Sequence, residues 1–365
     1  MTERNIPEIS TDEIIHTLSD YYTAAVSGGT SLKKLFTAFL WGPPGVGKSD
    51  AVREIAEAVR LQTGKKSVVT EVRLLLFSPI DLRGVPVPDK AHEFTNWLRP
   101  RIFDLDPSDD VVNFLFLDEL TAAAPAVQAA AYQVTLDRRI GEHELPDNCI
   151  VIGAGNRVTD NSVSFHMPAA LANRMKHFDI GVSFAGWRRW AVSHEINPYV
   201  LGYLSYDNTR LFSEDRIATD AAFPTPRSWE AVSRDLNIMG KAPWEIHTLI
   251  SASIGTDSAI EFEAWAKIFQ SLPAMADIFR GKTVTLPRKP DVLYAMISAM
   301  TGYITENREK LSIEELGHGI RFAGRFPADY GALFYRNLQD IPGLSGKLVR
   351  TPGFHEWTER IRAYM

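Results

Sequence analysis

A chain of 365 residues is long enough for two domains, and a composition of 45% hydrophobic and 23% charged residues is ordinary for a globular protein. The net charge of −6 argues against a protein that coats nucleic acid by bulk attraction and leaves only a local basic patch open. The single cysteine, Cys149, excludes an internal disulfide. Met1–Ser10 lacks the apolar core of a signal peptide, and no apolar run approaches the length of a bilayer span. The sequence therefore predicts a cytoplasmic protein without a membrane segment.

Residues 1–34 predict an N-terminal helical segment. A helix is expected over about Thr11–Ala25, and the pair Gly28-Gly29 would end it. The segment carries no motif with a chemical meaning. The next stretch, Leu35–Trp41, is short and apolar, which is typical of a buried strand.

Directly after this strand lies the phosphate-binding pattern G-x-x-x-x-G-K-[S/T], with every fixed position filled. Beyond it, over Asp50–Leu61, apolar residues recur with the period of a helix. Strand, glycine loop and helix are the context that the pattern requires, because glycines let backbone N–H groups turn inward and a helix N-terminus attracts anions. Lys48 would reach the β- and γ-phosphates of a nucleoside triphosphate, and the Ser49 hydroxyl would contact Mg²⁺. The predicted phosphate loop comprises Gly42, Pro43, Pro44, Gly45, Val46, Gly47, Lys48 and Ser49.

A second strand is predicted over Val68–Leu74, where β-branched residues are frequent. The segment that follows, Ser78–Asp104, holds four prolines and cannot form one long helix. Within it, Gly84–Trp97 indicates a strand, a turn and a returning strand. Such an inserted hairpin either contacts another molecule or is a decorated surface loop, and the residues leave both interpretations open.

A third buried strand, Val111–Leu117, delivers Asp118 and Glu119 to its carboxyl end, where α/β sheets bind ligands. Asp118 lies 70 residues beyond Lys48 (118 − 48), and the two acids complete the pattern of a phosphate-loop ATPase. Asp118 would order Mg²⁺ through its water molecules, and Glu119 would polarise the attacking water. The pair therefore predicts hydrolysis of ATP as well as binding.

A helix over Ala126–Leu136 precedes a second predicted hairpin, Asp137–Asn148, which is built around Gly141. The fourth strand, Cys149–Asn156, ends in a polar amide at the place where the γ-phosphate would lie. Asn156 could hold the attacking water there, or it could serve only as a turn residue. The sequence alone leaves these two roles open.

A short helix, Met167–Arg174, and a fifth strand, His177–Val182, end the α/β part, and strand patterning then stops near Ser183–Gly186. The chain is therefore predicted to form an α/β nucleotide-binding core over residues 35–184, with a five-stranded parallel sheet and β-hairpin inserts, followed by an all-α lid and C-terminal helices over residues 185–365. Helices are expected there at Trp187–Asn197, Ser228–Asn237, Pro243–Ile254, Ser258–Ser271, Asp291–Asn307 and His355–Tyr364.

In the order of these motifs the chain resembles an AAA+ ATPase, most closely one of the MoxR group. Gly42–Ser49 corresponds to Walker A and Asp118-Glu119 to Walker B. The hairpin at Gly84–Trp97 is similar to the helix-2 insert of that clade, and the hairpin around Gly141 is similar to its pre-sensor insert. The likeness covers roughly residues 35–236.

Three further positions match motifs of the same family. Asn156, within Gly-Ala-Gly-Asn-Arg, corresponds to sensor 1, and Arg227, within Thr-Pro-Arg-Ser-Trp, corresponds to sensor 2 at the start of a lid helix. Arg174, within Leu-Ala-Asn-Arg-Met, corresponds to the arginine finger. Most members have a phenylalanine after the finger, where this chain has Met175.

The resemblance implies a homo-oligomeric ring, usually a hexamer, with ATP and Mg²⁺ in a site shared between subunits. Arg174 would face the γ-phosphate of the neighbouring subunit, where such an arginine raises the rate by about 10³- to 10⁵-fold. Its alternative role is that of a surface arginine favoured by a helix dipole. Arg227 would couple loss of the γ-phosphate to rotation of the lid. Arg157 is a lesser candidate for either role.

Members of the resembled group act as chaperone-like enzymes that remodel or mature protein complexes, in some cases by inserting a metal or cofactor, and often with a von Willebrand factor A partner. Lys90–Trp97 and Arg138–Glu144 would then contact the client near the axial surface of the ring. An alternative is a nucleic-acid motor similar to helicases or restriction translocases, which Arg138-Arg139 favours and the acids of the same hairpin oppose. A third is a nucleotide-switched scaffold, which the full set of candidate catalytic residues opposes.

Overall fold

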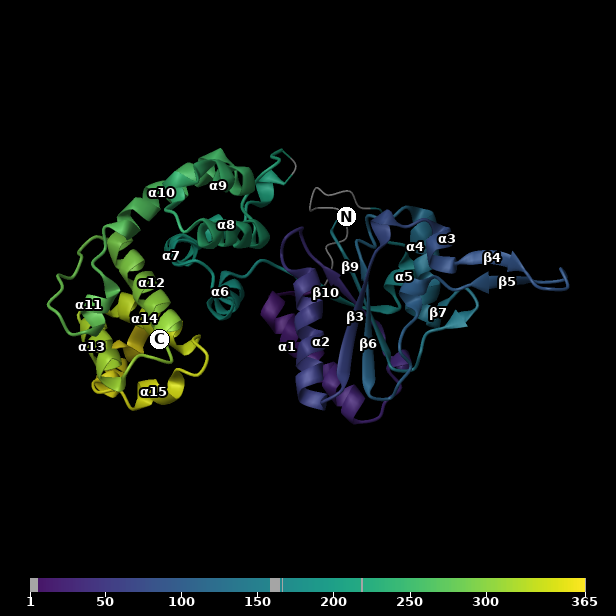
Figure 1. The fold of residues 1–365 in the computed structure, drawn as a ribbon, viewed down its shortest axis with the longest axis horizontal. Helices are drawn as coiled ribbons and strands as arrows, with labels where there is room; N and C mark the ends of the chain where they lie inside the picture. The colour runs from purple at the N-terminus through teal and green to yellow at the C-terminus, as the bar shows by residue number, and fades with distance from the viewer. Residues whose placement is uncertain (1–5, 158–164, 166, 218, 365) are drawn as a thin grey trace. The chain divides into compact units, whose positions relative to one another are not determined.

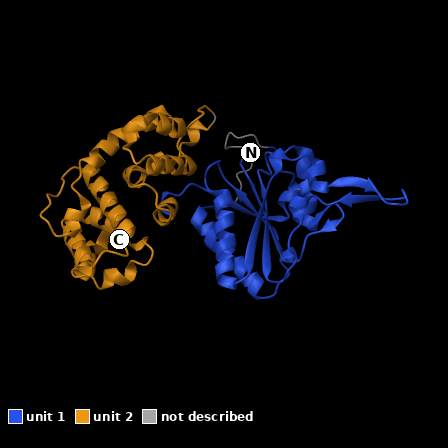
Figure 2. Cartoon of the chain, viewed as in Figure 1, with its two compact units in different colours: residues 1–186 blue, residues 187–365 orange. Residues whose placement is uncertain are grey.

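A computed structural model describes residues 6–157, 165, 167–217 and 219–364. By its internal contacts the chain divides into two compact units, Met1–Gly186 and Trp187–Met365 (Figure 2). The first unit is built around a β-sheet. The described residues of the second unit form helices and connecting segments.

Six parallel strands form the sheet, in the order β1-β10-β2-β9-β6-β3. Five of them are the strands predicted from the sequence, so the predicted α/β fold with a parallel phosphate-loop sheet is confirmed. The sixth, β1, is a two-residue edge strand that the sequence analysis did not predict, because a pairing of two residues leaves no periodic pattern. The strands are β1 (Glu8–Ile9), β2 (Thr37–Trp41), β3 (Lys66–Arg73), β6 (Val111–Asp118), β9 (Cys149–Gly155) and β10 (Met175–Ile180).

Helices cover both faces of this sheet (Figure 1). Two long helices pack on one face, and three shorter ones lie on the other together with the hairpins. The first set is α1 (Thr11–Ser27) and α2 (Lys48–Thr63), and the second is α3 (Pro79–Arg83), α4 (Pro125–Tyr132) and α5 (Ala169–Ala172).

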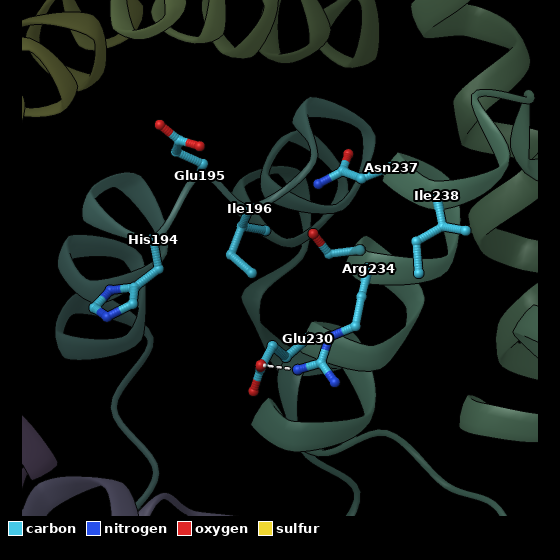
Figure 3. Close-up of a pocket in the computed structure, with 8 residues that line it drawn as sticks. His194, Glu195, Ile196, Glu230, Arg234, Asn237 and Ile238 are labelled. Carbon is cyan, nitrogen blue, oxygen red and sulfur yellow. Dashed lines mark hydrogen bonds and ion pairs between the residues drawn. The ribbon is translucent and has the colours of Figure 1, made fainter. Parts of the chain in front are cut away.

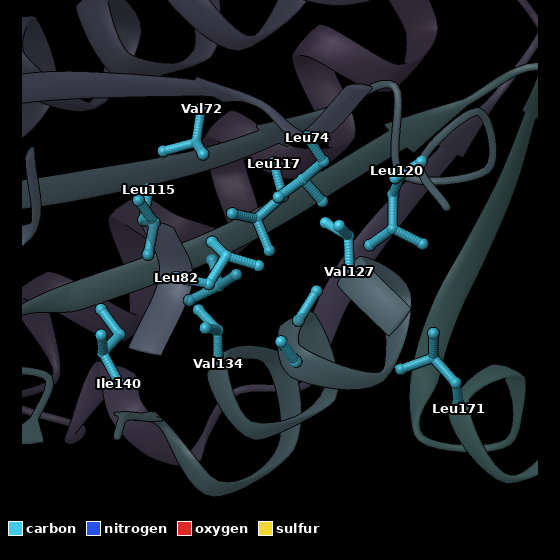
Figure 4. Close-up of a cluster of buried hydrophobic side chains, with 14 of the residues drawn as sticks. Val72, Leu74, Leu82, Leu115, Leu117, Leu120, Val127, Val134, Ile140 and Leu171 are labelled. Carbon is cyan, nitrogen blue, oxygen red and sulfur yellow. The ribbon is translucent and has the colours of Figure 1, made fainter. Parts of the chain in front are cut away.

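Strand β6 shows why an inner strand of this sheet consists mainly of apolar residues. Every residue from Val111 to Leu117 is buried, since both faces of the sheet are covered. Successive side chains point to opposite faces, so Leu115 and Leu117 join the cluster on the α4 side (Figure 4), whereas Phe114 and Phe116 join the cluster on the α1 and α2 side. The carboxyl end of β6 is thereby held between two packed layers.

The N-terminal segment belongs to the hydrophobic core of the first unit. β1 pairs with β10, and α1 packs against α2. Ile14, Leu18 and Tyr22 of α1 are buried in the same cluster as Val52 and Ile55 of α2. The sequence shows that this helix has an apolar face, but not which surface covers that face.

Both predicted hairpins are present. Gly84 opens the first with a φ of +91°, and any Cβ there would collide with the carbonyl of Leu98, so only glycine suits the position. Before the second hairpin, α4 continues into a π-helical turn, Gln133–Asp137. The first hairpin pairs β4 (Val85–Pro88) with β5 (Thr95–Leu98), and the second pairs β7 (Arg139–Ile140) with β8 (His143–Glu144).

In the second unit each predicted helix is present, and further helices occur where none was predicted. Helix α7 begins after Asn197, whose side chain accepts a hydrogen bond from the Tyr199 N–H at 3.0 Å. Helix α13 begins with a capping box between Ser312 and Glu315. The helices are α6 (Phe184–Ser193), α7 (Pro198–Tyr206), α8 (Pro226–Met239), α9 (His247–Ile254), α10 (Thr256–Gln270), α11 (Met275–Phe279), α12 (Pro290–Asn307), α13 (Ile313–Ala323), α14 (Ala328–Gln339), α15 (Ser345–Val349) and α16 (Phe354–Ile361).

Within the described ranges, no helix combines the length and the apolar character needed to cross a bilayer. Cys149 is buried in β9, and this burial raises the pKa of its thiol to about 12. The side chain is therefore a neutral thiol at physiological pH and packs as a small apolar group.

The packing of α1 predicts the effect of truncating Leu18, which is 2% exposed. Leu18→Ala is expected to lower the free energy of unfolding of the first unit by about 2–5 kcal/mol, because it leaves a cavity between α1 and α2. Urea denaturation of the full chain, with hydrogen exchange of the β2 amides as the local probe, measures this change. Thr17→Ala, at the adjacent exposed position, is the control, and equal stability of the two variants would contradict the packing of α1 in this core.

Candidate functional site

The phosphate loop joins β2 to α2 and depends on three backbone conformations that favour glycine. Gly42, Gly45 and Gly47 have φ values of +155°, +78° and +97°. A Cβ at Gly42 would also lie 2.7 Å from the carbonyl oxygen of Ile180 in β10. The backbone conformation therefore favours glycine at both fixed positions of the pattern and at Gly45 between them.

Lys48 is the first residue of α2 and is 9% exposed. Its ammonium donates hydrogen bonds to the carbonyls of Gly42 at 2.7 Å and Pro43 at 2.9 Å, and to Oδ1 of Asn156 at 2.9 Å. A buried cation needs such acceptors, since its desolvation is costly. Phosphate oxygens are charged acceptors that form stronger bonds, so Lys48 is placed to exchange the loop carbonyls for a phosphate.

Ser49 and Asp118 face each other beside this lysine. The Ser49 hydroxyl, from the first turn of α2, donates to Oδ2 of Asp118 at the end of β6, at 3.2 Å. A hydroxyl and a carboxylate are hard oxygen ligands of the kind that Mg²⁺ prefers, and the pair fits the predicted metal position.

Glu119 follows in a turn that leaves the sheet. Its backbone N–H donates to Oδ1 of Asp118 at 2.9 Å, and its φ of +56° lies in the left-handed region that residues with a Cβ seldom occupy. The N–H groups of Ala122 and Ala123 both bond to the Glu119 carbonyl. The backbone at the candidate base is thus constrained from both sides.

Asn156 is held through both its side chain and its backbone. Its amide oxygen accepts from Lys48, and its carbonyl accepts from the Thr121 hydroxyl at 3.1 Å. Thr121 packs so closely over Gly155 that a Cβ at that glycine would collide with the hydroxyl. The turn interpretation of Asn156 does not account for its contact with Lys48.

Sheet topology explains why these side chains meet. Strand β9 lies between β2 and β6, and all three run parallel, so their carboxyl ends lie along one edge. Lys48, Ser49, Asp118 and Asn156 all follow or end these strands. The predicted residues of the phosphate loop, Walker B and sensor 1 are therefore brought together.

Arg174, the predicted arginine finger, and Arg227, the predicted sensor 2 residue, are both exposed. Arg174 lies exposed just after α5, and Arg227 lies exposed at the second position of α8 in the second unit. Within the described part of the chain, neither side chain forms an ion pair or hydrogen bond. Their proposed roles remain predictions.

Arg157 is engaged elsewhere. Its Nε donates to Oδ1 of Asp179 in β10 at 2.6 Å, and its guanidinium also reaches the carbonyl of Ile180 at 3.3 Å. Both members of this ion pair are largely buried. The pairing with β10 opposes the lesser roles considered for Arg157.

A groove of about 320 Å³ in the second unit lies between the end of α6 and one side of α8 (Figure 3). Glu230 and Arg234 form an ion pair at 2.6 Å on this side of α8. Arg227 is not among the residues that line the groove, which therefore is not the predicted sensor 2 position. The lining residues are His194, Glu195, Ile196, Glu230, Ser233, Arg234, Asn237 and Ile238.

Two residues beside the nucleotide site were not identified from the sequence. The Thr11 hydroxyl, at the start of α1, donates to the carbonyl of Val46 in the phosphate loop at 3.1 Å. Arg73 lies opposite Asp118 in the register of β3 and β6. The hydrogen bond that Arg73 donates to the Glu71 carboxylate raises the pKa of the Arg73 guanidinium, and the charges of Asp118 and Glu119 add to that shift. No motif marks either residue, because each depends on packing between distant segments.

Comparison with known proteins agrees with this geometry. Residues 38–181 match the model of the family described as "ATPase family associated with various cellular activities (AAA)". This part of the chain therefore resembles an AAA domain. It spans the phosphate loop, both Walker B acids, Asn156 and Arg174, so the predicted AAA+ phosphate-loop fold is confirmed for the first unit. A search of curated proteins returned no match.

Solved structures similar to the chain share little of its sequence. PCH-2 of C. elegans is 16% identical, with 70% of this chain and 68% of that chain covered and a TM-score of 0.37. A mutant of RuvB from Thermotoga maritima is 16% identical, with 85% of this chain and 90% of that chain covered and a TM-score of 0.36. Neither likeness assigns the AAA domain to a subgroup, so the MoxR assignment rests on the sequence motifs and stays a proposal.

The contacts of Lys48 predict the effect of removing its ammonium. Lys48→Ala is expected to weaken binding of ATP by about 10- to 100-fold, because hydrogen bonds from a charged donor to the phosphates are lost. Calorimetric titration with ATP and Mg²⁺ measures the affinity. Lys34→Ala removes an exposed lysine before β2 and should bind as the parent does. Unchanged binding by Lys48→Ala would overturn the assignment of the phosphate loop.

Proposed function

We propose that the protein is an ATP-hydrolysing AAA+ ring ATPase of the MoxR-like group, which remodels or matures protein complexes in the cytoplasm. The observation that carries the ATPase proposal is the pair of contacts at the sheet edge, Lys48 to Asn156 at 2.9 Å and Ser49 to Asp118 at 3.2 Å. They join three motifs, the phosphate loop, Walker B and sensor 1, in one place, with Glu119 directly after Asp118. A complete set of this kind supports turnover and opposes a scaffold that only binds nucleotide.

The proposed chemistry assigns one task to each residue. Lys48 and the loop N–H groups bind the β- and γ-phosphates of ATP, while Ser49 and Asp118 hold Mg²⁺, which neutralises phosphate charge when bound. Glu119 accepts a proton from the attacking water, and Asn156 orients that water. The water oxygen bonds to the γ-phosphorus, the bond from that phosphorus to the bridging oxygen breaks, and ADP and phosphate are released.

The proposed ring accounts for the exposure of Arg174. Inside one subunit its guanidinium has no partner among the described residues, and an arginine finger needs a phosphate from the neighbouring subunit. The resemblance to AAA+ enzymes supports a homo-oligomer, most commonly a hexamer. Arg227 would report loss of the γ-phosphate to the helical lid by a hinge motion.

Two hairpins support a protein client or a von Willebrand factor A partner. Figure 1 shows β4 and β5 projecting away from the sheet, beside β7. The hairpins touch, since Nε2 of His143 lies 2.7 Å from the carbonyl oxygen of Trp97. Phe94 and Leu98 on the first hairpin are 71% and 58% exposed. Exposed apolar side chains on a projecting element suit a contact with another protein.

The case for a nucleic-acid motor becomes weaker in the structure. Arg138 is 4% exposed, and its guanidinium donates to the carbonyl of Leu35 rather than facing solvent. Arg139 donates to the carbonyl of Glu142 at 3.2 Å and lies 4.0 Å from the carboxylate of Glu144. Arg138 is thus not free to bind phosphates of nucleic acid, and the charge of Arg139 is offset by the nearby Glu144 carboxylate. An ATPase rate that DNA stimulates, with a steep dependence on salt, would favour the motor instead.

Glu119→Gln separates binding from hydrolysis. The variant should lower kcat by about 10²- to 10⁴-fold, because the amide cannot accept the proton of the attacking water, while its affinity for ATP stays near that of the parent. Steady-state phosphate release and nucleotide titration measure the two quantities. Glu57→Gln, on the solvent side of α2, is the matched control. A parental rate for Glu119→Gln would place the base elsewhere.

Mixed rings test whether Arg174 acts across an interface. Arg174→Ala alone should lose about 10³- to 10⁵-fold in kcat. Mixing it with Lys48→Ala should restore part of the activity, because a Lys48→Ala subunit still offers its arginine to an intact neighbouring site. Phosphate release is followed as the ratio of the two variants is changed. Absence of rescue at every ratio would contradict a role in trans.

A further inference from the structure

A hydrogen-bonded histidine connects the strand before the phosphate loop to the helix before Arg174. The indole Nε1–H of Trp41, the last residue of β2, donates to Nδ1 of His177 in β10 at 2.9 Å. On the other side of the ring, Nε2 of His177 lies 2.7 Å from the carbonyl oxygen of Ala172, the last residue of α5. The two rings also stack, with centroids 6.0 Å apart and an interplanar angle of 24°.

The partners of His177 determine which nitrogen carries its proton. An indole N–H can only donate, so Nδ1 must be unprotonated, and a carbonyl can only accept, so Nε2 must carry the hydrogen. A neutral imidazole with its hydrogen on Nε2 satisfies both contacts at once. The side chain is therefore a fixed bridge between two elements rather than a filler of the core.

Each end of this bridge is close to a residue of the proposed ATPase site. Trp41 is followed directly by Gly42, whose carbonyl accepts from Lys48 at 2.7 Å. Ala172 lies two residues before Arg174, and the Arg174 N–H bonds to the carbonyl of Leu171 at 3.1 Å, which ties the arginine to the last turn of α5. The buried Leu171 anchors that turn in the core (Figure 4).

Binding of a phosphate would act on the first end of this path. A phosphate that takes Lys48 from the loop carbonyls removes the bond to Gly42, and this change starts one residue from Trp41. Two hydrogen bonds then connect the start of the loop to the α5 turn, one from the Trp41 indole to His177 and one from the His177 imidazole to the carbonyl of Ala172. Strand β10 makes a second connection to the nucleotide site. Asp179, on the same face of β10 as His177, accepts a hydrogen bond from Arg157, which follows Asn156 in the chain.

We propose that His177 is a positioning residue for Arg174: it holds the α5 turn against the strand that leads into the phosphate loop of its own subunit. His177 would thereby position the arginine that this subunit presents to its neighbour. The inference rests on the proposed function of Arg174 in trans.

Variants of His177 and Trp41 in the full chain test the positioning role first. His177→Phe keeps an aromatic ring and loses both hydrogen bonds. In the full chain it should lower kcat about tenfold with little change in the affinity for ATP, whereas His177→Gln, whose amide can both accept and donate, should recover part of the rate. Trp41→Phe removes one of the two bonds and should also lower kcat.

Subunit mixing then locates the defect. The Lys48→Ala subunit serves as the donor of the finger, and the Arg174→Ala subunit supplies the active site. His177→Phe added to the donor should cut the rescued activity about tenfold, while the same change added to the Arg174→Ala subunit should leave it as before. His16→Phe, at an exposed position of α1, controls for the ring substitution.

Three results would overturn the inference. The first is a parental kcat for both His177→Phe and Trp41→Phe. The second is a loss of rescued activity when His177→Phe is placed in the Arg174→Ala subunit. The third is a loss of rescued activity with His177→Gln that equals the loss with His177→Phe. If the Lys48→Ala and Arg174→Ala mixture shows no rescue before His177 is changed, the trans role of Arg174 itself fails, and the positioning role fails with it.

Discussion

The burial of the Lys48 ammonium is the constraint on which the first unit depends. A cation this enclosed must be surrounded by acceptors, and here they include the loop carbonyls of Gly42 and Pro43 and the amide of Asn156. To supply them, the loop must turn through left-handed glycines, and β9 must lie beside β2. These acceptors are neutral, so phosphate oxygens can replace them with a gain in electrostatic energy. The interaction that shapes the loop without nucleotide is therefore the same one that prepares it for ATP.

Strand β10 has a second organising role, which follows from its place beside β2. Its side chains at 177 and 179 point to one face and bind polar groups from two different segments. His177 holds Trp41 before the phosphate loop, and Asp179 holds Arg157 after Asn156. Since the chain enters β10 directly from Arg174, the strand joins both sides of the nucleotide site to the residue proposed to act on a neighbour. Polar groups in such a covered layer are satisfied by specific partners, which favours a single arrangement of the three segments.

The sequence predicted those parts of the fold that leave a periodic or compositional pattern. The long apolar run of β6 and the glycine pattern before Lys48 are local signals, and the order of motifs was enough to bring Asp118 and Asn156 to one edge of the sheet. Features that depend on contacts between distant segments were missed. The pairing of β1 with β10 and the bond from Thr11 to Val46 are of this kind. Helix α13 differs, because its start signal, the capping box between Ser312 and Glu315, is local in the sequence and does not depend on apolar periodicity.

Arg138 shows how packing changes an argument based on charge. In the sequence it is one of two adjacent arginines on a hairpin, which favours a site for nucleic acid. In the structure its guanidinium is buried and bonds to the carbonyl of Leu35, just before β2, and burial lowers its pKa from the ordinary value of arginine. The cation therefore attaches the base of the second hairpin to the strand that leads into the phosphate loop. A hairpin fastened in this way can transmit a movement of that strand to whatever contacts its exposed tip, and this supports a remodeller of proteins better than a surface that holds a nucleic-acid backbone by charge.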